Sequence, residues 1–258
     1  MAAVALITGA SGLIGRHVVA QWDLSDLEVV LARHETDDLL SPGVPAALVA
    51  RVRPLVVVHL AWDASGTPGY RTSPRNGAWV DASLELARAC EDAGAWLVAT
   101  GTPLDTVAEM PDAYAAAKSR LWHMLARRTR AGEMTWIRPY YVVDPDRRRP
   151  ALVDEALAAS ERGATLVLRT PESRHDFVHA QDVGRAIVAA VRHGLRGELE
   201  VGSGRARSVA TLVEALGVAW EPSPDAPGAT VLHSSAVADS ARLLEVGWSP
   251  VRTKELFE

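Results

Sequence analysis

Short apolar runs alternate with longer amphipathic stretches through the first half of the chain, and this alternation restricts the fold more than any other feature of the sequence. The short runs are apolar on both faces, as buried strands are, and the longer stretches have the apolar spacing of helices. This order predicts an α/β fold, a doubly wound parallel sheet with helices on both faces and right-handed crossovers. The expected strands are residues 3–8, 27–32, 55–60, 95–100 and 134–138, and the expected helices are residues 13–22, 44–51, 78–92 and 113–130.

A glycine-rich turn joins the first expected strand to the first expected helix. In a Rossmann-type fold, glycines at such a turn allow its tight geometry, let the backbone approach a pyrophosphate and let helix and strand pack closely. The turn has a strand before it and a helix after it, so it predicts a dinucleotide cofactor rather than a turn that binds nothing. The cofactor-binding candidates from this segment are Gly9, Ser11, Gly12, Leu13, Ile14, Gly15 and Arg16.

The strand–helix rhythm loosens beyond Pro139 and divides the chain. We expect a dinucleotide-binding core at residues 1–143, with residues 176–202 returning to it. Residues 144–258 are expected to form mostly a small C-terminal substrate-binding lobe. Within them, residues 221–228 hold three prolines and a glycine and predict an irregular connection. The expected elements of this half are helices at 152–162, 180–193 and 209–216 and strands at 165–168 and 198–201.

Composition excludes several classes of protein. The formal net charge of −5 disfavours a broad electrostatic hold on nucleic acid. Cys90 is the only cysteine, which excludes a disulfide framework or a cysteine metal cluster, and we expect no metal site. The longest apolar run, residues 55–62, is far too short to span a membrane. The N-terminus carries no cationic leader, so we expect a cytoplasmic protein.

Tyr114 and Lys118 form the candidate catalytic pair. They lie four residues apart on an expected helix and therefore share one of its faces. The chain has only four tyrosines and two lysines, so a chance pair at this spacing is rare. The spacing therefore favours a functional pair over two exposed helix residues without a role. A phenol with a pKa near ~10 is a poor acid–base group at neutral pH, and a neighbouring ammonium lowers that pKa. The pair therefore predicts proton transfer to or from a substrate oxygen.

The Thr-Gly-x-x-Gly-x-x-Gly turn and the Tyr-x-x-x-Lys pair resemble the short-chain dehydrogenase/reductase superfamily, in particular its extended branch of sugar-nucleotide epimerases and reductases. Residues 138–145, 175–183 and 244–250 extend the resemblance over essentially the whole chain. It implies a nicotinamide cofactor and a third catalytic group, a hydroxyl that binds the substrate oxygen. Thr102 fits this role best, and Thr100 is its competitor. The Asp-Glu pair that dehydratases of this branch use does not follow Thr102, so dehydration is not expected.

Arg33 decides which nicotinamide cofactor we expect. The resemblance places an acidic residue that binds the adenosine ribose at this strand end, and Arg33 stands there instead. A guanidinium pairs well with a 2′-phosphate, so we expect NADP(H) rather than NAD(H), with Arg16 as a second cation. The alternative is that Arg33 is a solvated surface residue. His59 is expected to be a packed strand residue. The resemblance implies further cofactor contacts from Asp38, Leu39, Leu60, Ala61, Pro139 and Tyr140.

The substrate side of the sequence has fewer cations than the family uses. His175 stands where the resemblance places an arginine that grips a nucleotide phosphate. Residues 221–235 hold no arginine or lysine for the family's later phosphate contact. The arginine run at 147–149 could compensate, or it could be a solvated loop. The candidates for an aromatic substrate pocket are Trp62, Tyr141 and His175, with Tyr70 and Trp79 as further possibilities.

These features predict an NADPH-dependent ketoreductase that acts on a polyketide or aromatic natural-product ketone or on a keto-deoxysugar. Tyr114 would protonate the carbonyl oxygen, Lys118 would hold the tyrosine and a ribose, and Thr102 would orient the substrate. Two alternatives stay open: a nucleotide-sugar epimerase with tightly bound NAD, and a non-catalytic dinucleotide-binding sensor. The helices at 78–92 and 113–130 match those through which the family forms dimers, and they predict a homodimer.

Overall fold

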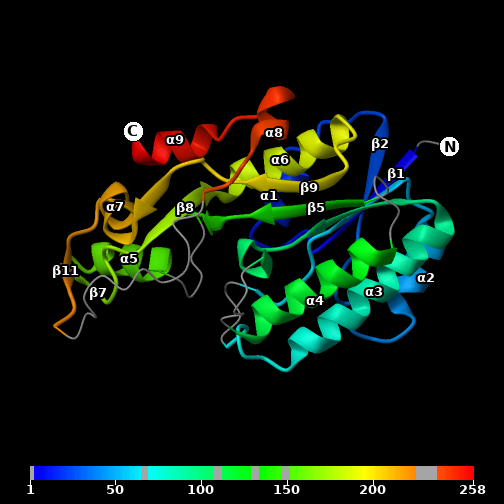
Figure 1. Cartoon of the computed structure of the whole chain (residues 1–258), viewed down its shortest axis with the longest axis horizontal. Helices are drawn as coiled ribbons and strands as arrows, with labels where there is room; N and C mark the ends of the chain where they lie inside the picture. Colours follow the sequence, from blue (N-terminus) through cyan, green and yellow to red (C-terminus); the bar gives the residue numbers. More distant parts are fainter. Residues whose placement is uncertain (1–2, 65–68, 107–111, 129–133, 147–151, 225–236) are drawn as a thin grey trace.

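The computed structural model describes residues 3–64, 69–106, 112–128, 134–146, 152–224 and 237–258 (Figure 1). A six-stranded sheet of order β2-β1-β3-β4-β5-β9 forms its centre, and every neighbouring pair of strands is parallel. The predicted doubly wound parallel sheet is therefore confirmed. The strands are β1 (Ala3–Thr8), β2 (Leu27–Leu31), β3 (Val56–His59), β4 (Trp96–Thr100), β5 (Met134–Pro139) and β9 (Gly197–Val201).

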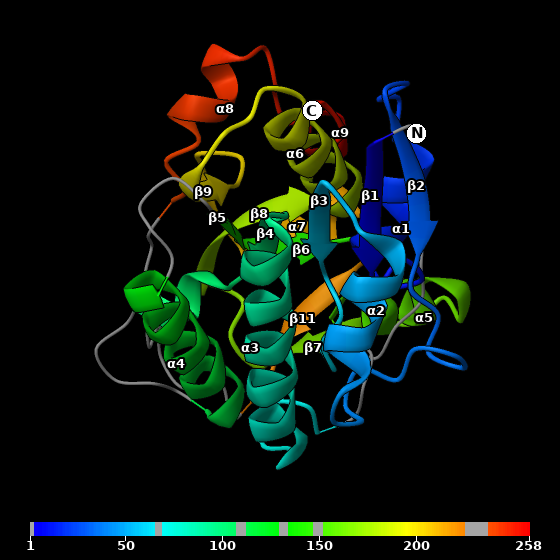
Figure 2. The same cartoon turned by 90° about the vertical axis from the view of Figure 1, so that its right-hand side faces the viewer.

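Helices cover both faces of the sheet because its strands are apolar on both sides. Ile7 and Val58 pack in one core cluster, whereas Leu6 and Val57, their neighbours in the chain, pack in the other. Helix α1 packs on α6 against the first face, and α3 lies between α2 and α4 on the second (Figure 2). The helices are α1 (Gly15–Ala20), α2 (Val44–Val52), α3 (Arg75–Ala93), the 3₁₀ helix η1 (Pro103–Thr106), α4 (Ala113–Arg128) and α6 (Ala180–Arg192).

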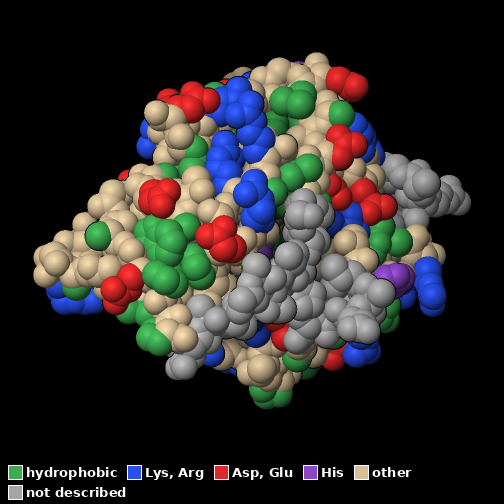
Figure 3. All heavy atoms as spheres, turned by 60° about the vertical axis from the view of Figure 1, so that its left-hand side comes forward, with side chains coloured by type: hydrophobic (Ala, Val, Ile, Leu, Met, Phe, Trp, Pro, Cys, Tyr) green, Lys and Arg blue, Asp and Glu red, His purple; other side chains and the backbone are tan. Residues whose placement is uncertain are grey.

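A smaller unit lies to the left of the central sheet in Figure 1. It contains a three-stranded sheet of order β10-β8-β6 and the parallel pair β11-β7. Val153, Phe177 and Leu212 belong to its separate core. On the face of this unit that Figure 3 shows, acidic, basic and apolar side chains lie among one another. Its elements are β6 (Tyr141–Val143), α5 (Leu152–Glu161), β7 (Leu166–Leu168), β8 (Arg174–His179), β10 (Ala206–Ser208), α7 (Val209–Ala215) and β11 (Trp220–Pro222).

Of the C-terminal helices, α8 (Ala241–Glu245) returns to the core, and α9 (Val251–Phe257) contacts both α6 of the core and β8 and α7 of the smaller unit. Leu243 and Trp248 pack in the same cluster as α6 and the first face of the sheet. Residues 144–258 are therefore shared between the two units more evenly than we expected. Conversely, most of β8 falls within residues 176–202, the segment expected to return to the core, yet β8 pairs with β6 and β10 of the smaller sheet.

Short elements account for most other differences from the predicted boundaries. β11 occupies the start of residues 221–228, where we expected an irregular connection, because it pairs with β7. The strands β6 and β10 have three residues each, too few for a period of alternation to be recognised. Helix α1 spans only Gly15–Ala20, shorter than the expected 13–22, because the glycine turn continues to its first residue.

The apolar side chains that favoured a homodimer are largely used inside the chain. Leu121 and Leu125 of α4 are buried, and Trp122 packs on Trp136 with ring centres 5.5 Å apart. Helix α4 therefore exposes less apolar surface than expected, and the homodimer stays a prediction. Among the helices that the structure describes, none is both long enough and apolar enough to span a membrane.

A buried carboxylate joins α9 to α6. Asp182 accepts hydrogen bonds at 2.7 Å from both the backbone nitrogen and the hydroxyl of Thr253. The same hydroxyl accepts a 2.8 Å bond from the backbone nitrogen of His179 at the end of β8. Thr253 thus connects three elements through one fully buried side chain.

We expect Thr253→Val to lower the free energy of unfolding by about 2–3 kcal/mol, because the valine keeps the shape but leaves the buried His179 N–H without an acceptor. Urea denaturation followed by tryptophan fluorescence measures this change. Thr72→Val, at an exposed loop position, is the control and should change stability by less than about 0.5 kcal/mol. Equal stabilities of the two variants would contradict the prediction.

Candidate active site

The glycine turn packs directly against the segment that follows β3. Gly9 has a φ of +70°, and a Cβ there would lie 2.6 Å from the backbone nitrogen of Ala61. A Cβ on Gly15 would collide with the Gly9 carbonyl oxygen. Because the chain leaves β1 towards β2 and later returns to β3 on the other side, the turn lies at the switch point where doubly wound sheets bind ligands.

A cavity of about 510 Å³ opens at this switch point. Its lining comes from the core, through the glycine turn, the ends of β3 and β4 and helix α4, and from the smaller unit, through β6, β8, α5 and α7. The three predicted catalytic residues, Thr102, Tyr114 and Lys118, all line it. The other predicted site residues in the lining are Gly9, Gly12, Leu13, Ile14, Gly15, Leu60, Trp62, Pro139, Tyr140, Tyr141 and His175.

Lys118 is buried at the centre of this lining. Its Nζ donates a 2.9 Å hydrogen bond to the carbonyl oxygen of Thr100 and lies 3.8 Å from the centre of the Trp62 ring. The distance from Nζ to the Tyr114 ring centre is 6.0 Å. Burial lowers the pKa of Lys118 to about 7, and the negative charge of Asp105 opposes this shift.

The expected lowering of the Tyr114 pKa is not found. Burial raises the pKa of the phenol above its ordinary value, the neighbouring Tyr70 adds to the rise, and Arg71 opposes it. The rings of Tyr70 and Trp62 enclose the phenol edge to face, with centres 5.3 Å and 6.3 Å away. Tyr114 therefore keeps its proton at neutral pH, which suits a proton donor better than a base.

Asp105 holds the segment that carries both hydroxyl candidates, and the sequence analysis did not identify this role. The buried carboxylate accepts hydrogen bonds from the Thr102 backbone nitrogen at 3.2 Å, from Trp136 Nε1 at 3.1 Å and from Arg138 Nε at 2.6 Å. A Cβ on Gly101 would collide with Asp105 and Trp136. Thr100 and Thr102 both line the cavity, so the choice between them stays open. The only sequence signal was an acidic residue shortly after an expected strand.

Several predicted cofactor residues lie outside the cavity lining. Arg33 is exposed at the end of β2, and Ser11 is exposed in the glycine turn. Leu39 is buried in the core, and Asp38 accepts hydrogen bonds from Leu40 N and Ser41 Oγ, both at 3.1 Å. Ala61 is half-buried beside Gly9, and its nitrogen donates to the Thr8 hydroxyl at 3.3 Å.

Arg16 was expected as a second cation for a 2′-phosphate, but the structure gives it another partner. Its guanidinium forms an ion pair with Asp144, which stands at the position of a family glycine. Arg51 is linked to Arg33 through Asp37. The buried Asp37 carboxylate accepts from the Arg33 backbone nitrogen at 3.2 Å and from the Arg51 guanidinium at 2.5 Å. No sequence pattern indicated this contact, because it is the packing of α2 that places Arg51 there.

The substrate side of the cavity is aromatic. The rings of Tyr141 and His175 contact each other at a tilt of 36°, with centres 3.9 Å apart, and Phe177 lies edge-on to both. Burial lowers the pKa of His175 to about 4, so its imidazole is neutral at pH 7. Tyr70 and Arg71 also line the cavity.

Two residues near the cavity have structural roles. Trp79 is a buried core residue that stacks behind Trp62, with ring centres 6.0 Å apart. His59 is a packed strand residue, as expected, whose ring nitrogens bond to the Thr8 and Ser83 hydroxyls at 2.8 Å and 2.9 Å. Burial lowers the His59 pKa to about 3.

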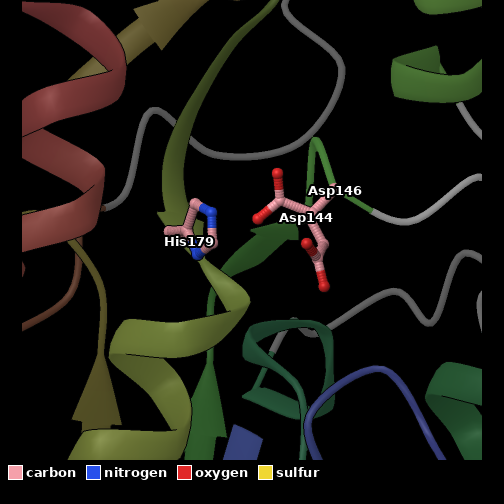
Figure 4. Close-up of side chains that lie close together, drawn as sticks. All are labelled: Asp144, Asp146 and His179. Carbon is pink, nitrogen blue, oxygen red and sulfur yellow. The ribbon is translucent and has the colours of Figure 1, made fainter. Parts of the chain in front are cut away.

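Asp144, Asp146 and His179 lie together where β8 leads into α6 (Figure 4). Their ligand atoms are within 4.8 Å of one another, as a metal site would require. However, Asp144 Oδ2 already binds Arg16 and His17. His179 Nδ1 accepts a 3.0 Å bond from the Gln181 backbone nitrogen, so its Nε2 carries the ring proton and has no lone pair for a cation. The donor set therefore fits an ion-pair cluster better than a metal.

The family model for NAD-dependent epimerases and dehydratases matches residues 5–202. The chain belongs to this family. It is an NAD(P)-dependent enzyme of the short-chain dehydrogenase/reductase type. No protein of curated function gives a significant sequence match.

Solved structures of the same fold include epimerases and reductases. The UDP-glucose 4-epimerase of Thermus thermophilus in complex with NAD is 24% identical, with a TM-score of 0.68 over 96% of this chain and 94% of that chain. RMD of Pseudomonas aeruginosa complexed with NADPH is 20% identical, with a TM-score of 0.73 over 96% and 93%. The dTDP-4-dehydrorhamnose reductase of Bacillus anthracis in complex with NADP is 15% identical, with a TM-score of 0.70 over 90% and 88%.

The residues present fit the dinucleotide that the family implies. Gly9, Gly12 and Gly15 leave a stretch of backbone free of side chains in the wall of the cavity. This cradle is the feature that a pyrophosphate needs for close approach. The ends of β3 and β5 continue the lining with Leu60 and Pro139.

We expect Gly15→Ala to abolish NADPH binding, because the added Cβ must displace the Gly9 carbonyl and reshape the cradle. Quenching of tryptophan fluorescence by added NADPH measures this effect. Gly77→Ala in α3 is the matched control, since a Cβ there meets nothing within 4 Å, and it should bind normally with stability raised by up to about 1 kcal/mol. Normal NADPH affinity in Gly15→Ala would show that the turn does not hold the cofactor.

Proposed function

We propose that this enzyme is an NADPH-dependent ketoreductase whose substrate is an apolar, aromatic or polyketide-like ketone. The observation that carries the proposal is the chemistry of the cavity wall. Among the described residues of the lining, Arg71 and Lys118 are the only charged side chains. The smaller unit contributes apolar groups to this wall, including Leu152, Val153, Phe177, Val209 and Leu212.

This wall suits an uncharged ring system better than a nucleotide diphosphate. Arg71 NH1 already donates a 2.7 Å bond to Asp112, and Lys118 is engaged by Thr100 and Trp62. Two phosphates brought against the remaining apolar wall would lose hydration without gaining cations. The arginines at 147–149 lie outside the described residues.

The proposed reaction divides between three side chains of the cavity. Tyr114 donates its phenolic proton to the carbonyl oxygen of the substrate. Lys118, one helical turn away, stabilises the negative charge left on the phenol. Thr102 hydrogen-bonds the carbonyl oxygen and orients it. When bound, NADPH supplies the hydride that adds to the carbonyl carbon.

The family also favours two reactions on sugar nucleotides. Reduction of a keto-deoxysugar nucleotide is supported by the fold shared with the dTDP-4-dehydrorhamnose reductases, and epimerisation by the fold shared with the UDP-glucose 4-epimerases. An epimerase purifies with NAD bound and needs no added NADPH, which separates it from both reductases. A non-catalytic sensor binds the dinucleotide and turns over no ketone; the presence of Tyr114 and Lys118 argues against it.

We expect a preference for NADPH over NADH that depends on Arg33. Removing its guanidinium in Arg33→Ala should weaken NADPH binding roughly tenfold to a hundredfold and leave NADH binding nearly unchanged, because only NADPH carries the 2′-phosphate. Fluorescence titrations with both cofactors measure this, and Arg88→Ala, at an exposed position on α3, is the control. Equal affinities of the unmodified enzyme for NADPH and NADH would exclude the proposed preference.

We expect Tyr114→Phe to lower the rate of ketone reduction by about 10²–10⁴-fold and to leave NADPH affinity almost unchanged, since only the proton donor is removed. Steady-state assays on a simple aromatic ketone measure the rate, and a fluorescence titration measures the affinity. A substrate with an enol or phenol beside its ketone supplies its own proton and should retain most activity. Full activity of Tyr114→Phe on every ketone would show that the tyrosine has another role.

A further inference from the structure

We propose that Trp62 is a positioning residue for the reaction, and that its indole face holds the protonated ammonium of Lys118 one helical turn from Tyr114. The proposal rests on the proposed function in one respect, namely that Lys118 assists Tyr114. Sequence analysis assigned Trp62 to the substrate pocket, and the structure adds a contact with the catalytic lysine. Trp62 directly follows the His-Leu-Ala segment at residues 59–61, which begins at the last residue of β3.

The contact has the geometry of a cation–π interaction. Lys118 Nζ lies 3.8 Å from the centre of the Trp62 ring, well inside the limit of about 6 Å for such pairs. The second contact of Nζ is the Thr100 carbonyl oxygen, at 2.9 Å. Lys118 is 4% exposed, so the indole and the carbonyl replace most of the water that an ammonium would otherwise bind.

The indole is itself held in place from two sides. Its Nε1 donates a 3.0 Å hydrogen bond to the Asn76 side-chain oxygen, and the Trp79 ring stacks on it with ring centres 6.0 Å apart. Asn76 is buried, and its amide nitrogen donates to the Tyr70 carbonyl at 2.7 Å. The Tyr70 ring lies against Tyr114. Asn76 therefore bonds both to Trp62, which contacts Lys118, and to the residue that contacts Tyr114.

The contact between Trp62 and Lys118 affects how much of the lysine is charged at physiological pH. Burial lowers the Lys118 pKa to about 7, so the fraction of charged lysine depends on small local interactions. The groups facing it are Asp105 on η1, which favours the charged form, His59 on β3, which is neutral with a pKa of about 3, and Tyr114 on α4, whose pKa is raised. An indole face also favours the ammonium over the neutral amine. Weakening the indole therefore moves the Lys118 pKa downward.

The experiment uses the fact that Lys118 and Lys254 are the only lysines. The full-length protein is prepared with tryptophan or with tetrafluorotryptophan, which keeps the shape of the indole but removes electron density from its face. Acetylation by acetic anhydride is measured for each lysine by mass spectrometry between pH 5 and pH 10, in the absence of turnover. Lys254 is exposed and serves as the internal reference.

We expect the midpoint of Lys118 labelling to fall by about one pH unit on fluorination, with the Lys254 midpoint unchanged. In Trp62→Phe, fluorination should no longer move the Lys118 midpoint. In Trp122→Phe, four residues after Lys118 on α4, the shift should persist. An unchanged midpoint of Lys118 labelling in the fluorinated protein overturns the proposal. This measurement uses the unmodified sequence, so it does not depend on whether Trp62→Phe folds. A shift that persists in folded Trp62→Phe overturns it as well.

Activity provides a separate readout. If the ketoreductase reaction is also correct, the alkaline limb of the pH profile for NADPH-dependent reduction of a test ketone moves down by the same amount as the labelling midpoint. Absence of any ketone reduction overturns the proposed function while the labelling result still decides the Trp62 contact. A labelling shift without a shift in the pH profile overturns the positioning role and leaves only a structural contact.

Discussion

The parallel alignment of β1, β3, β4 and β5 is the constraint on which the site depends. Strands that run the same way end at the same edge of the sheet. The glycine turn, the Leu60–Trp62 segment, the threonines at the end of β4 and just beyond it, and Pro139 therefore meet there although they are far apart in the chain. The β1–β3 contact is close because Gly9 carries no side chain towards Ala61. The cavity forms where this edge faces the smaller unit.

Burial and buried charges set the protonation of the predicted catalytic groups. Asp105 is satisfied by Arg138, Trp136 and the Thr102 backbone, so one carboxylate both orients the threonine segment and supports the charge of Lys118. Tyr114 is enclosed by aromatic rings and keeps its proton, while Lys118 titrates close to neutral pH. Burial thus moves the two pKa values in opposite directions, since it penalises the charged form of each group.

In and beside the smaller unit, two residues depart from the pattern that the family resemblance implies. At the family's arginine position, His175 is a neutral ring in tilted contact with Tyr141. At a family glycine position, Asp144 binds Arg16 and His17 and so joins the start of α1 to the loop after β6. Both departures reduce the positive charge available to a phosphate, and together with the apolar residues of α5 and α7 they support an apolar substrate.

The sequence by itself determined the parallel sheet, the glycine cradle and the Tyr114–Lys118 pair, because these depend on local periodicity and on short spacings along one strand or helix. Short strands such as β6 and β10 were missed because three residues are too few to show an alternation of apolar and polar side chains. Only the tertiary structure decided that Arg16 pairs with Asp144, that Arg51 approaches Arg33 through Asp37, and that Lys118 rests on Trp62. Each of these contacts joins residues that are far apart in the chain. The direction of the Tyr114 pKa shift likewise follows from burial of the phenol beside Tyr70 and Trp62. Such contacts depend on how the layers pack in space, which no local pattern of residues records.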